Sequence, residues 1–208
     1  MKFLKYSLFF LVLVLLLWGA LVLFVPKDDG DFHVVLDPGH GGEDPGAVVG
    51  EIYEKDINLS VALLVHDILS AQDGVTVSMT RNDDSFPSLS ERAEFANRED
   101  ADLYVSIHAN ALDDETYSGL FTFYHPNKRS SKEIAELIQD SASNASGAIN
   151  RGVRSENYVV LRETDMPAVL VETGFMTCPE ELSLLIDDEY QTKIAKGISE
   201  GILAFISK

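Results

Sequence analysis

Short apolar runs alternate with amphipathic stretches along most of the chain. Residues 32–36 form an apolar run that stops at Asp37-Pro38-Gly39, which is typical of a buried strand entering a loop. Over residues 56–69, apolar side chains recur at helical spacing. Continuous apolar strands that alternate with amphipathic helices predict an α/β fold, with a mostly parallel or mixed twisted sheet and helices on both faces. The same reading predicts strands at 75–80, 101–107, 119–124, 159–162 and 168–172, and helices after 88, 130 and 177 and over 194–205.

Three of these helices begin with a Ser or Thr followed three residues later by Glu. This spacing predicts a capping box, in which the hydroxyl and the carboxylate each bond a backbone N–H of the first turn. The pairs are Ser88 with Glu91, Ser130 with Glu133, and Thr177 with Glu180, the last with Pro179 in its first turn.

The N-terminal segment has a different pattern. Residues 6–25 carry no charge, and a helix of that length spans about 30 Å, the thickness of a bilayer's hydrocarbon core. Lys2 and Lys5 precede it, so the rest of the chain is expected to be exported. We therefore expect residues 1–25 to be an uncleaved membrane anchor, with a cleaved signal segment as the alternative. Residues 26–31 are expected to form a short linker. Residues 32–208 are expected to form one domain at the outer face of the cytoplasmic membrane or in the wall.

Composition narrows the possible functions. The 208 residues include 16 basic and 34 acidic side chains, a net charge of −18, so there is no basic surface for a nucleic-acid partner. Cys178 is the single cysteine, which excludes an intramolecular disulfide and a cysteine-rich zinc module.

Polar residues follow several of the predicted strands, where ligand sites of α/β sheets lie. His40 follows the first strand, His108 follows the strand at 101–107, and Glu54 opens the first helix. Two neutral imidazoles and a carboxylate suit Zn²⁺ with a fourth position open for water, and glycines around His40 let the backbone approach closely. Asp37 and Asp44 are candidates for orienting an imidazole, although both also suit turns.

The segments LDPGHGGEDPGA, EKDINL, SIHAN and VETGFM, in this order, resemble the zinc-dependent N-acetylmuramoyl-L-alanine amidases (amidase type 3) of bacterial cell walls. The resemblance covers nearly all of residues 33–206. It implies one zinc ion per chain. The resemblance assigns His40, Glu54 and His108 as metal ligands, Glu172 as the catalytic residue, and Asn110, Arg81 and Arg162 as candidates for substrate contacts or site support.

The resemblance implies a peptidoglycan hydrolase. Zinc-activated water would cleave the amide between N-acetylmuramic acid and the L-alanine of the stem peptide, with Glu172 moving the proton. The one-domain layout also resembles spore-germination amidases, and a vegetative wall role stays open. Alternatives are a non-catalytic peptidoglycan-binding protein on the same fold and a zinc peptidase acting within the stem peptide. Only ten residues separate His108 from Gly119, which leaves no room for a blocking helix, so we expect no obligatory activator.

Overall fold

The computed structural model describes residues 30–208, within which residues 32–208 form one compact unit. The predicted anchor or signal segment, residues 1–25, lies outside the described residues. Across the described part of the chain, no helix combines the length and the apolar character needed to cross a bilayer.

A six-stranded sheet runs through the centre of the unit in the order β4-β1-β5-β8-β6-β7. The first four strands are parallel, β6 is antiparallel to β8, and β7 is parallel to β6. This mixed sheet confirms the predicted fold class. The strands are β1 (Phe32–Pro38), β4 (Val75–Met79), β5 (Leu103–Asn110), β6 (Leu120–Tyr124), β7 (Asn150–Ser155) and β8 (Ala168–Phe175), and a separate hairpin joins β2 (Val48–Val49) and β3 (Ile52–Tyr53).

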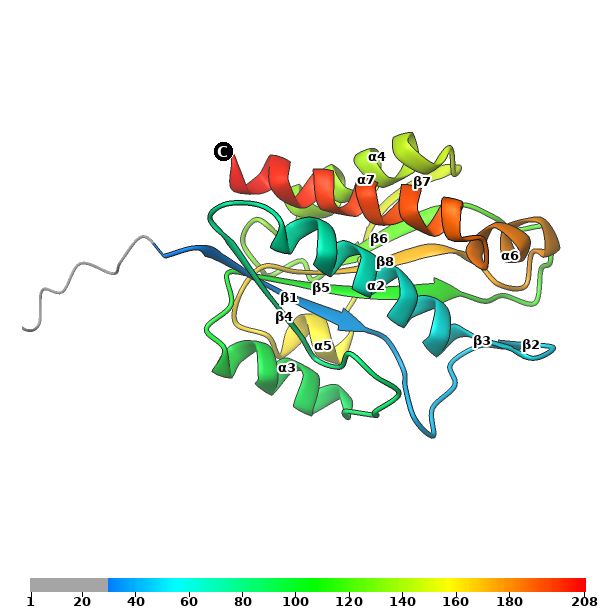
Figure 1. Cartoon of the computed structure of the whole chain (residues 1–208), viewed down its shortest axis with the longest axis horizontal. Coiled ribbons are helices and arrows are strands. Elements are labelled where there is room, and N and C mark those ends of the chain that lie inside the picture. Colours follow the sequence, from blue (N-terminus) through cyan, green and yellow to red (C-terminus); the bar gives the residue numbers. More distant parts are fainter. Residues whose placement is uncertain (1–29) are drawn as a thin grey trace, which may run out of the picture. The chain divides into compact units, whose positions relative to one another are not determined.

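Helices cover both faces of the sheet, as predicted (Figure 1). The three long helices lie on one face, and two shorter ones lie on the other. A further short helix, α6 (Pro179–Leu185), follows β8. The long helices are α2 (Glu54–Ser70), α4 (Ser131–Ser146) and α7 (Asp188–Ile206), and the helices opposite are α3 (Leu89–Arg98) and α5 (Val159–Arg162).

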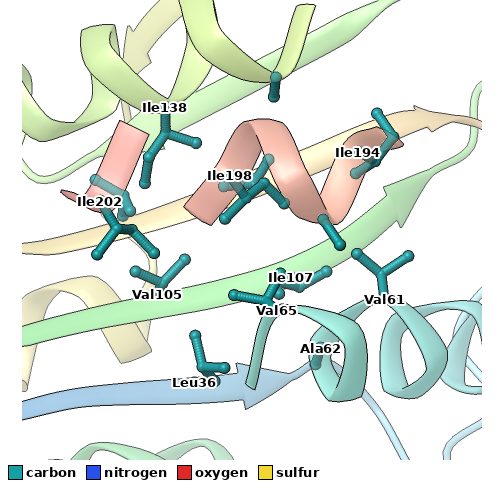
Figure 2. Close-up of a cluster of buried hydrophobic side chains, with 14 of the residues drawn as sticks. Leu36, Val61, Ala62, Val65, Val105, Ile107, Ile138, Ile194, Ile198 and Ile202 are labelled. Carbon is teal, nitrogen blue, oxygen red and sulfur yellow. The ribbon is translucent and has the colours of Figure 1, made fainter. Parts of the chain in front are cut away.

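The larger part of the core lies between the sheet and the three long helices (Figure 2). Val105 and Ile107 of β5 contribute the sheet side, and Val65 of α2 with Ile198 of α7 covers them; all four side chains are buried. The opposite face has a second cluster, rich in aromatic residues, beneath α3 and α5. Burial on both faces explains why β5 and β8 are almost continuously apolar up to the carboxyl edge.

Two predictions of local structure are wrong. Residues 159–162 form the helical turn α5 and not a strand, because the N–H groups of Leu161 and Arg162 donate to the Tyr158 carbonyl. Conversely, β7 was not predicted. It lies at the edge of the sheet, and its polar, glycine-containing sequence has no continuous apolar run.

Of the three predicted capping boxes, only the one at Ser88 is confirmed. Its amide donates to Glu91 Oε2 at 2.8 Å, and its hydroxyl accepts from the Glu91 amide. Ser130 has a left-handed backbone (φ 63°), and its side chain makes no hydrogen bond that caps the helix. The Thr177 hydroxyl instead accepts from the Leu112 amide, so the predicted boxes at these two residues are wrong.

Candidate metal centre

Three predicted ligands meet at the carboxyl edge of the sheet. His40 lies in the loop after β1, Glu54 is the first residue of α2, and His108 is near the end of β5. His40 Nε2 is 3.2 Å from Glu54 Oε2, and His108 Nδ1 is 2.9 Å from Glu54 Oε1. One ligand atom from each residue lies within 4.8 Å of the others. The fold therefore brings together groups that are far apart in the sequence.

This cluster fits a zinc ion. Metal–ligand bonds of 2.0–2.2 Å in a tetrahedral site separate neighbouring ligand atoms by about 3.3 Å, close to the spacings from Glu54 to the imidazole nitrogens. Two imidazoles with one carboxylate form the donor set typical of a catalytic site that keeps one position for water. The imidazole rings lie 4.9 Å apart at 80°, so they approach the shared point from different directions.

Glycines make the space that these ligands occupy. A Cβ at Gly46, which has φ 67°, would lie 2.5 Å from Glu54 Oε2 and 2.7 Å from His40 Cδ2. Gly39 is similarly close to the His108 ring. The sequence predicted that glycines let the backbone approach a metal closely. In the structure they instead leave room for the ligand side chains, because a Cβ at Gly39 or Gly46 would clash with those side chains.

Hydrogen bonds fix the orientation of the ligands. His40 Nδ1 donates to Asp44 Oδ2 at 2.8 Å, which directs Nε2 toward Glu54. Glu54 itself accepts from the Ala47 amide at 2.9 Å and from Asn58 Nδ2 at 3.1 Å. Asp44 thus has the orienting role that its place in the motif suggested.

Electrostatics favour the charged forms of Glu54 and His40. Although burial opposes the shift, the hydrogen bonds from the two histidines hold the pKa of Glu54 well below its usual range. Burial also opposes the shift at His40, but hydrogen bonds to Glu54 and Asp44 raise the pKa of His40 to about 9. Opposite charges packed this closely form a site that a divalent cation can enter by displacing protons.

The sequence suggested Asp37 as a residue that orients an imidazole, and this prediction is wrong. Its carboxylate is buried and accepts from Arg92 at 2.8 Å and from the Tyr104 hydroxyl at 2.6 Å. Burial tends to raise the pKa of Asp37, but the Arg92 guanidinium beside it and the hydroxyl donors lower it overall.

The sequence reasoning missed Arg92. Its Nη2 donates to the His40 carbonyl at 2.7 Å and its Nη1 to the Pro38 carbonyl, so it supports the loop that carries the first ligand. His40 has a left-handed backbone (φ 61°), a conformation that persists only where neighbours hold it. A sequence signal existed: Arg92 lies on the same stripe of α3 as the buried Ala93 and Ala96, where a charge needs a partner.

Arg81 was a candidate for substrate contact. It is 3% exposed, and its guanidinium donates to the carbonyls of Pro38, Gly39, Lys55 and Asp83. These bonds tie the loop after β1 to the start of α2. The geometry therefore favours support of the site over contact with substrate.

The other two candidates for substrate contact are Arg162 and Asn110, and each bonds a neighbouring residue of the chain. Arg162 is exposed and pairs with Glu163 at 3.0 Å, and Asn110 Oδ1 accepts from the Ala111 amide at 2.8 Å. Neither residue lines the cleft that His40 and His108 line. Substrate contact by Asn110 and Arg162 stays a prediction.

A cleft of about 580 Å³ opens over the ligand cluster. His40, His108 and Glu172 line one part of it, and apolar side chains such as Leu89 and Tyr158 form the walls. A concave apolar cleft with a few convergent polar groups is the usual form of a site for a small molecule or a peptide segment.

Glu172 lies beside the metal ligands within this cleft. It is on β8 directly opposite His108 of β5 in the sheet register. Its Oε2 is buried and accepts no hydrogen bond from any group in residues 30–208. Burial, reinforced by the charge of Glu54, raises the pKa of Glu172 to about 7. An unpartnered carboxyl with such a pKa can both accept and release a proton near neutral pH.

Comparisons with known proteins agree on one family. The family described as N-acetylmuramoyl-L-alanine amidase matches residues 34–204. The germination-specific N-acetylmuramoyl-L-alanine amidase of Bacillus subtilis (strain 168) is 35% identical over an alignment of 190 residues that covers 84% of this chain and 80% of the relative.

Solved structures give the same result. An N-acetylmuramoyl-L-alanine amidase from Clostridium difficile 630 is similar with a TM-score of 0.84 and 39% identity, over 86% of this chain and 98% of that one. The CwlD amidase from Clostridioides difficile, solved in complex with the GerS lipoprotein, has a TM-score of 0.80 and 35% identity, over 85% of this chain and 99% of that one.

Proposed function

The chain belongs to the N-acetylmuramoyl-L-alanine amidase family, and from this membership and the geometry of the site we infer that it hydrolyses peptidoglycan. The bond cleaved is the amide between the lactyl group of N-acetylmuramic acid and the L-alanine of the stem peptide. The observation that carries this proposal is the unpartnered Glu172 carboxyl in the same cleft as His40 and His108.

We propose that His40, Glu54 and His108 hold one zinc ion per chain. Their spacing and the glycines that make room for them support this assignment. When bound, zinc supplies a Lewis acid that polarises the scissile carbonyl and lowers the pKa of water. The side chains of this chain provide the rest of the chemistry.

Glu172 is the proposed general base and acid. Its carboxylate accepts a proton from the attacking water as the oxygen bonds to the carbonyl carbon. It then delivers that proton to the leaving nitrogen as the C–N bond breaks, so a carboxylic acid and a free amine result. The raised pKa of Glu172, about 7, supports both transfers at neutral pH.

The test is the substitution Glu172→Gln, with the exposed Glu156→Gln as the control. We expect the Glu172 variant to lose turnover by about 10²- to 10⁴-fold while it still binds one zinc per chain, measured by elemental analysis. The Glu156 variant should match the wild type. Turnover retained in the Glu172 variant would move the general base elsewhere.

The products distinguish the alternatives. Mass analysis of digested peptidoglycan should show free stem peptides that begin with L-alanine and intact glycan strands. Peptides split internally would indicate a zinc peptidase. Binding without any product would indicate a non-catalytic peptidoglycan-binding protein.

We further propose that the enzyme remodels the wall or the spore cortex from the outer face of the cytoplasmic membrane. Relatives include a germination-specific amidase and the LytC amidase, both of Bacillus subtilis. The uncharged residues 6–25 support an anchor. Membrane fractionation with sequencing of the mature N-terminus tests it: recovery of a chain that begins beyond residue 25 in the soluble fraction would contradict an anchor.

We also propose that the site works without an obligatory activator. The cleft reaches His40, His108 and Glu172, and only residues 111–119 connect β5 to β6. The purified chain with zinc should therefore digest intact sacculi by itself. Bound zinc without digestion, and digestion restored by a partner protein, would contradict this proposal.

A further inference from the structure

A row of aromatic rings leads from the cleft along the face of the sheet that carries Glu172. Tyr158 lines the cleft and meets Phe123 edge to face, with ring centroids 5.5 Å apart. Phe123 stacks on Phe121 at 6.1 Å, and Phe121 stacks on Tyr117 at 6.2 Å. These contacts form a continuous row of packed rings that begins at the cleft, and the two central rings, Phe121 and Phe123, are buried.

This aromatic row is close to Glu172 because of the strand register. Phe121 of β6 is the antiparallel partner of Glu172 on β8. Opposed residues on neighbouring strands project from the same face, with Cα atoms about 5 Å apart. The Phe121 ring is therefore the immediate neighbour of the Glu172 side chain.

Two arginines of the edge strand β7 lie on this row. The Arg154 guanidinium is 4.1 Å from the Phe121 ring centroid, and the Arg151 guanidinium is 4.5 Å from that of Tyr117. Arg151 Nε also donates to the Ser118 carbonyl. Stacking on aromatic rings holds the two guanidinium planes in place while their outer N–H groups stay free to donate.

Among residues 30–208, neither arginine forms an ion pair of the kind that Arg92 and Arg162 form, although the charge of Arg151 acts on the Glu181 carboxylate. The chain as a whole has 34 acidic and only 16 basic residues. Two arginines without an ion pair beside the cleft therefore form a local positive region on an acidic protein. Arg154 is exposed, so this region is accessible to an anion.

We propose that Arg154, with Arg151 beyond it, binds a carboxylate of the stem peptide whose first amide bond lies at Glu172. This inference rests on the proposed function. The Arg154 guanidinium is one aromatic side chain away from Glu172, on the order of 10 Å, and an extended peptide covers that distance in about three residues. Stem peptides carry carboxylates on residues within that reach, and a planar guanidinium matches a carboxylate.

The test uses two synthetic substrates, N-acetylmuramoyl-L-Ala-γ-D-Glu-L-Lys with free carboxylates and the same molecule with both carboxylates converted to carboxamides. Wild type should have a kcat/KM at least tenfold higher for the free acid. Arg154→Gln should lose about 10- to 100-fold on the free acid and less than threefold on the amide, because it removes a charge-assisted hydrogen bond. Arg154→Lys should keep part of the preference.

The matched control is Arg98→Gln. Arg98 also stacks on an aromatic ring, that of Phe95 at 5.3 Å, but it lies on α3, and Phe95 is not one of the rings in the row beside Glu172. The Arg98→Gln variant should leave kcat/KM for both substrates unchanged. A second readout is calorimetric binding of the free acid to the Glu172→Gln chain, with and without Arg154→Gln, because binding there does not depend on turnover.

The outcomes separate the two proposals. If zinc-loaded wild type cleaves neither substrate, the proposed function fails. If wild type cleaves both, and Arg154→Gln lowers both rates equally or neither, the carboxylate site is overturned while the amidase stands. If Arg154→Gln unfolds at too low a temperature to be assayed, the salt dependence of the wild-type rates tests the carboxylate site. The rate on the free acid must fall more steeply with NaCl than the rate on the amide, and equal slopes would contradict the proposal.

Discussion

Gly39, which directly follows β1, lies against the imidazole ring of His108 on the neighbouring strand β5. A Cβ on Gly39 would lie 2.2 Å from His108 Cε1 and 2.3 Å from Nε2. The backbone of the loop that carries His40 therefore sets the position of the second imidazole. The absence of one methyl group keeps two metal ligands aligned.

Gly39→Ala should weaken zinc binding, since the ring must rotate or the loop must move to accept the new methyl. We expect a 10- to 100-fold loss of zinc affinity, measured by competition with a chromophoric chelator. Gly174→Ala is the control, because its Cβ would meet mainly the flexible end of Leu185 at 3.3 Å. Equal zinc affinity in wild type and Gly39→Ala would show that the contact has no effect on the ligands.

Asp44→Asn tests the carboxylate that orients His40. The neutral amide of the variant would form a weaker hydrogen bond with His40 Nδ1 than the carboxylate does. The His40 imidazole should therefore be a weaker and less ordered metal ligand. Zinc affinity should fall by about 10- to 100-fold with little change in melting temperature. The surface pair His66 and Asp67, at 3.1 Å, offers the matched control Asp67→Asn, which should leave zinc affinity unchanged.

Asp37→Asn should destabilise the fold, because it leaves the Arg92 guanidinium buried without its counter-charge. Breaking one partner of a buried pair costs about 3–5 kcal/mol, measurable by denaturant unfolding. The exposed Asp113→Asn should stay within about 0.5 kcal/mol of wild type.

The buried ion pair of Asp37 and Arg92 also predicts how the free energy of unfolding depends on pH. The folded pKa of Asp37 is lowered from 3.8. Its contribution is therefore complete above about pH 4 and is lost as the pH falls through the lower folded value. The unfolding free energy of wild type should decline more steeply below pH 4 than that of Asp37→Asn. Parallel curves would contradict the buried ion pair.

The two serines at helix starts should respond in opposite ways. Ser88→Ala removes an observed cap and should cost about 1 kcal/mol of unfolding free energy. Ser130 makes no cap bond and has φ 63°, so Ser130→Gly should stabilise the fold by about 0.5 kcal/mol through relief of the left-handed backbone. Thermal unfolding of both variants checks this, and a loss of stability in Ser130→Gly would restore the predicted cap.

Some errors of prediction have a physical explanation. The run Val159–Arg162 is apolar in either conformation, and only its packing beneath the sheet selects a helical turn. The edge strand β7 gains its order from pairing with β6, because its own polar sequence favours no element. The secondary structure of such short segments depends on the elements packed against them more than on their own residues.

The sequence by itself determined the alternation of strands and helices, and hence the α/β fold. It also determined which polar residues follow the strands, because the periodicity of apolar positions and the chemistry of side chains are local properties. Only the tertiary structure decided that His40, Glu54 and His108 meet, and that Arg81 and Arg92 turn inward to hold a loop. It also decided that Arg154 stacks on Phe121, the register partner of Glu172. Those relationships depend on strand register and on the shape of the packed core, which arise when distant segments bury one another's surfaces.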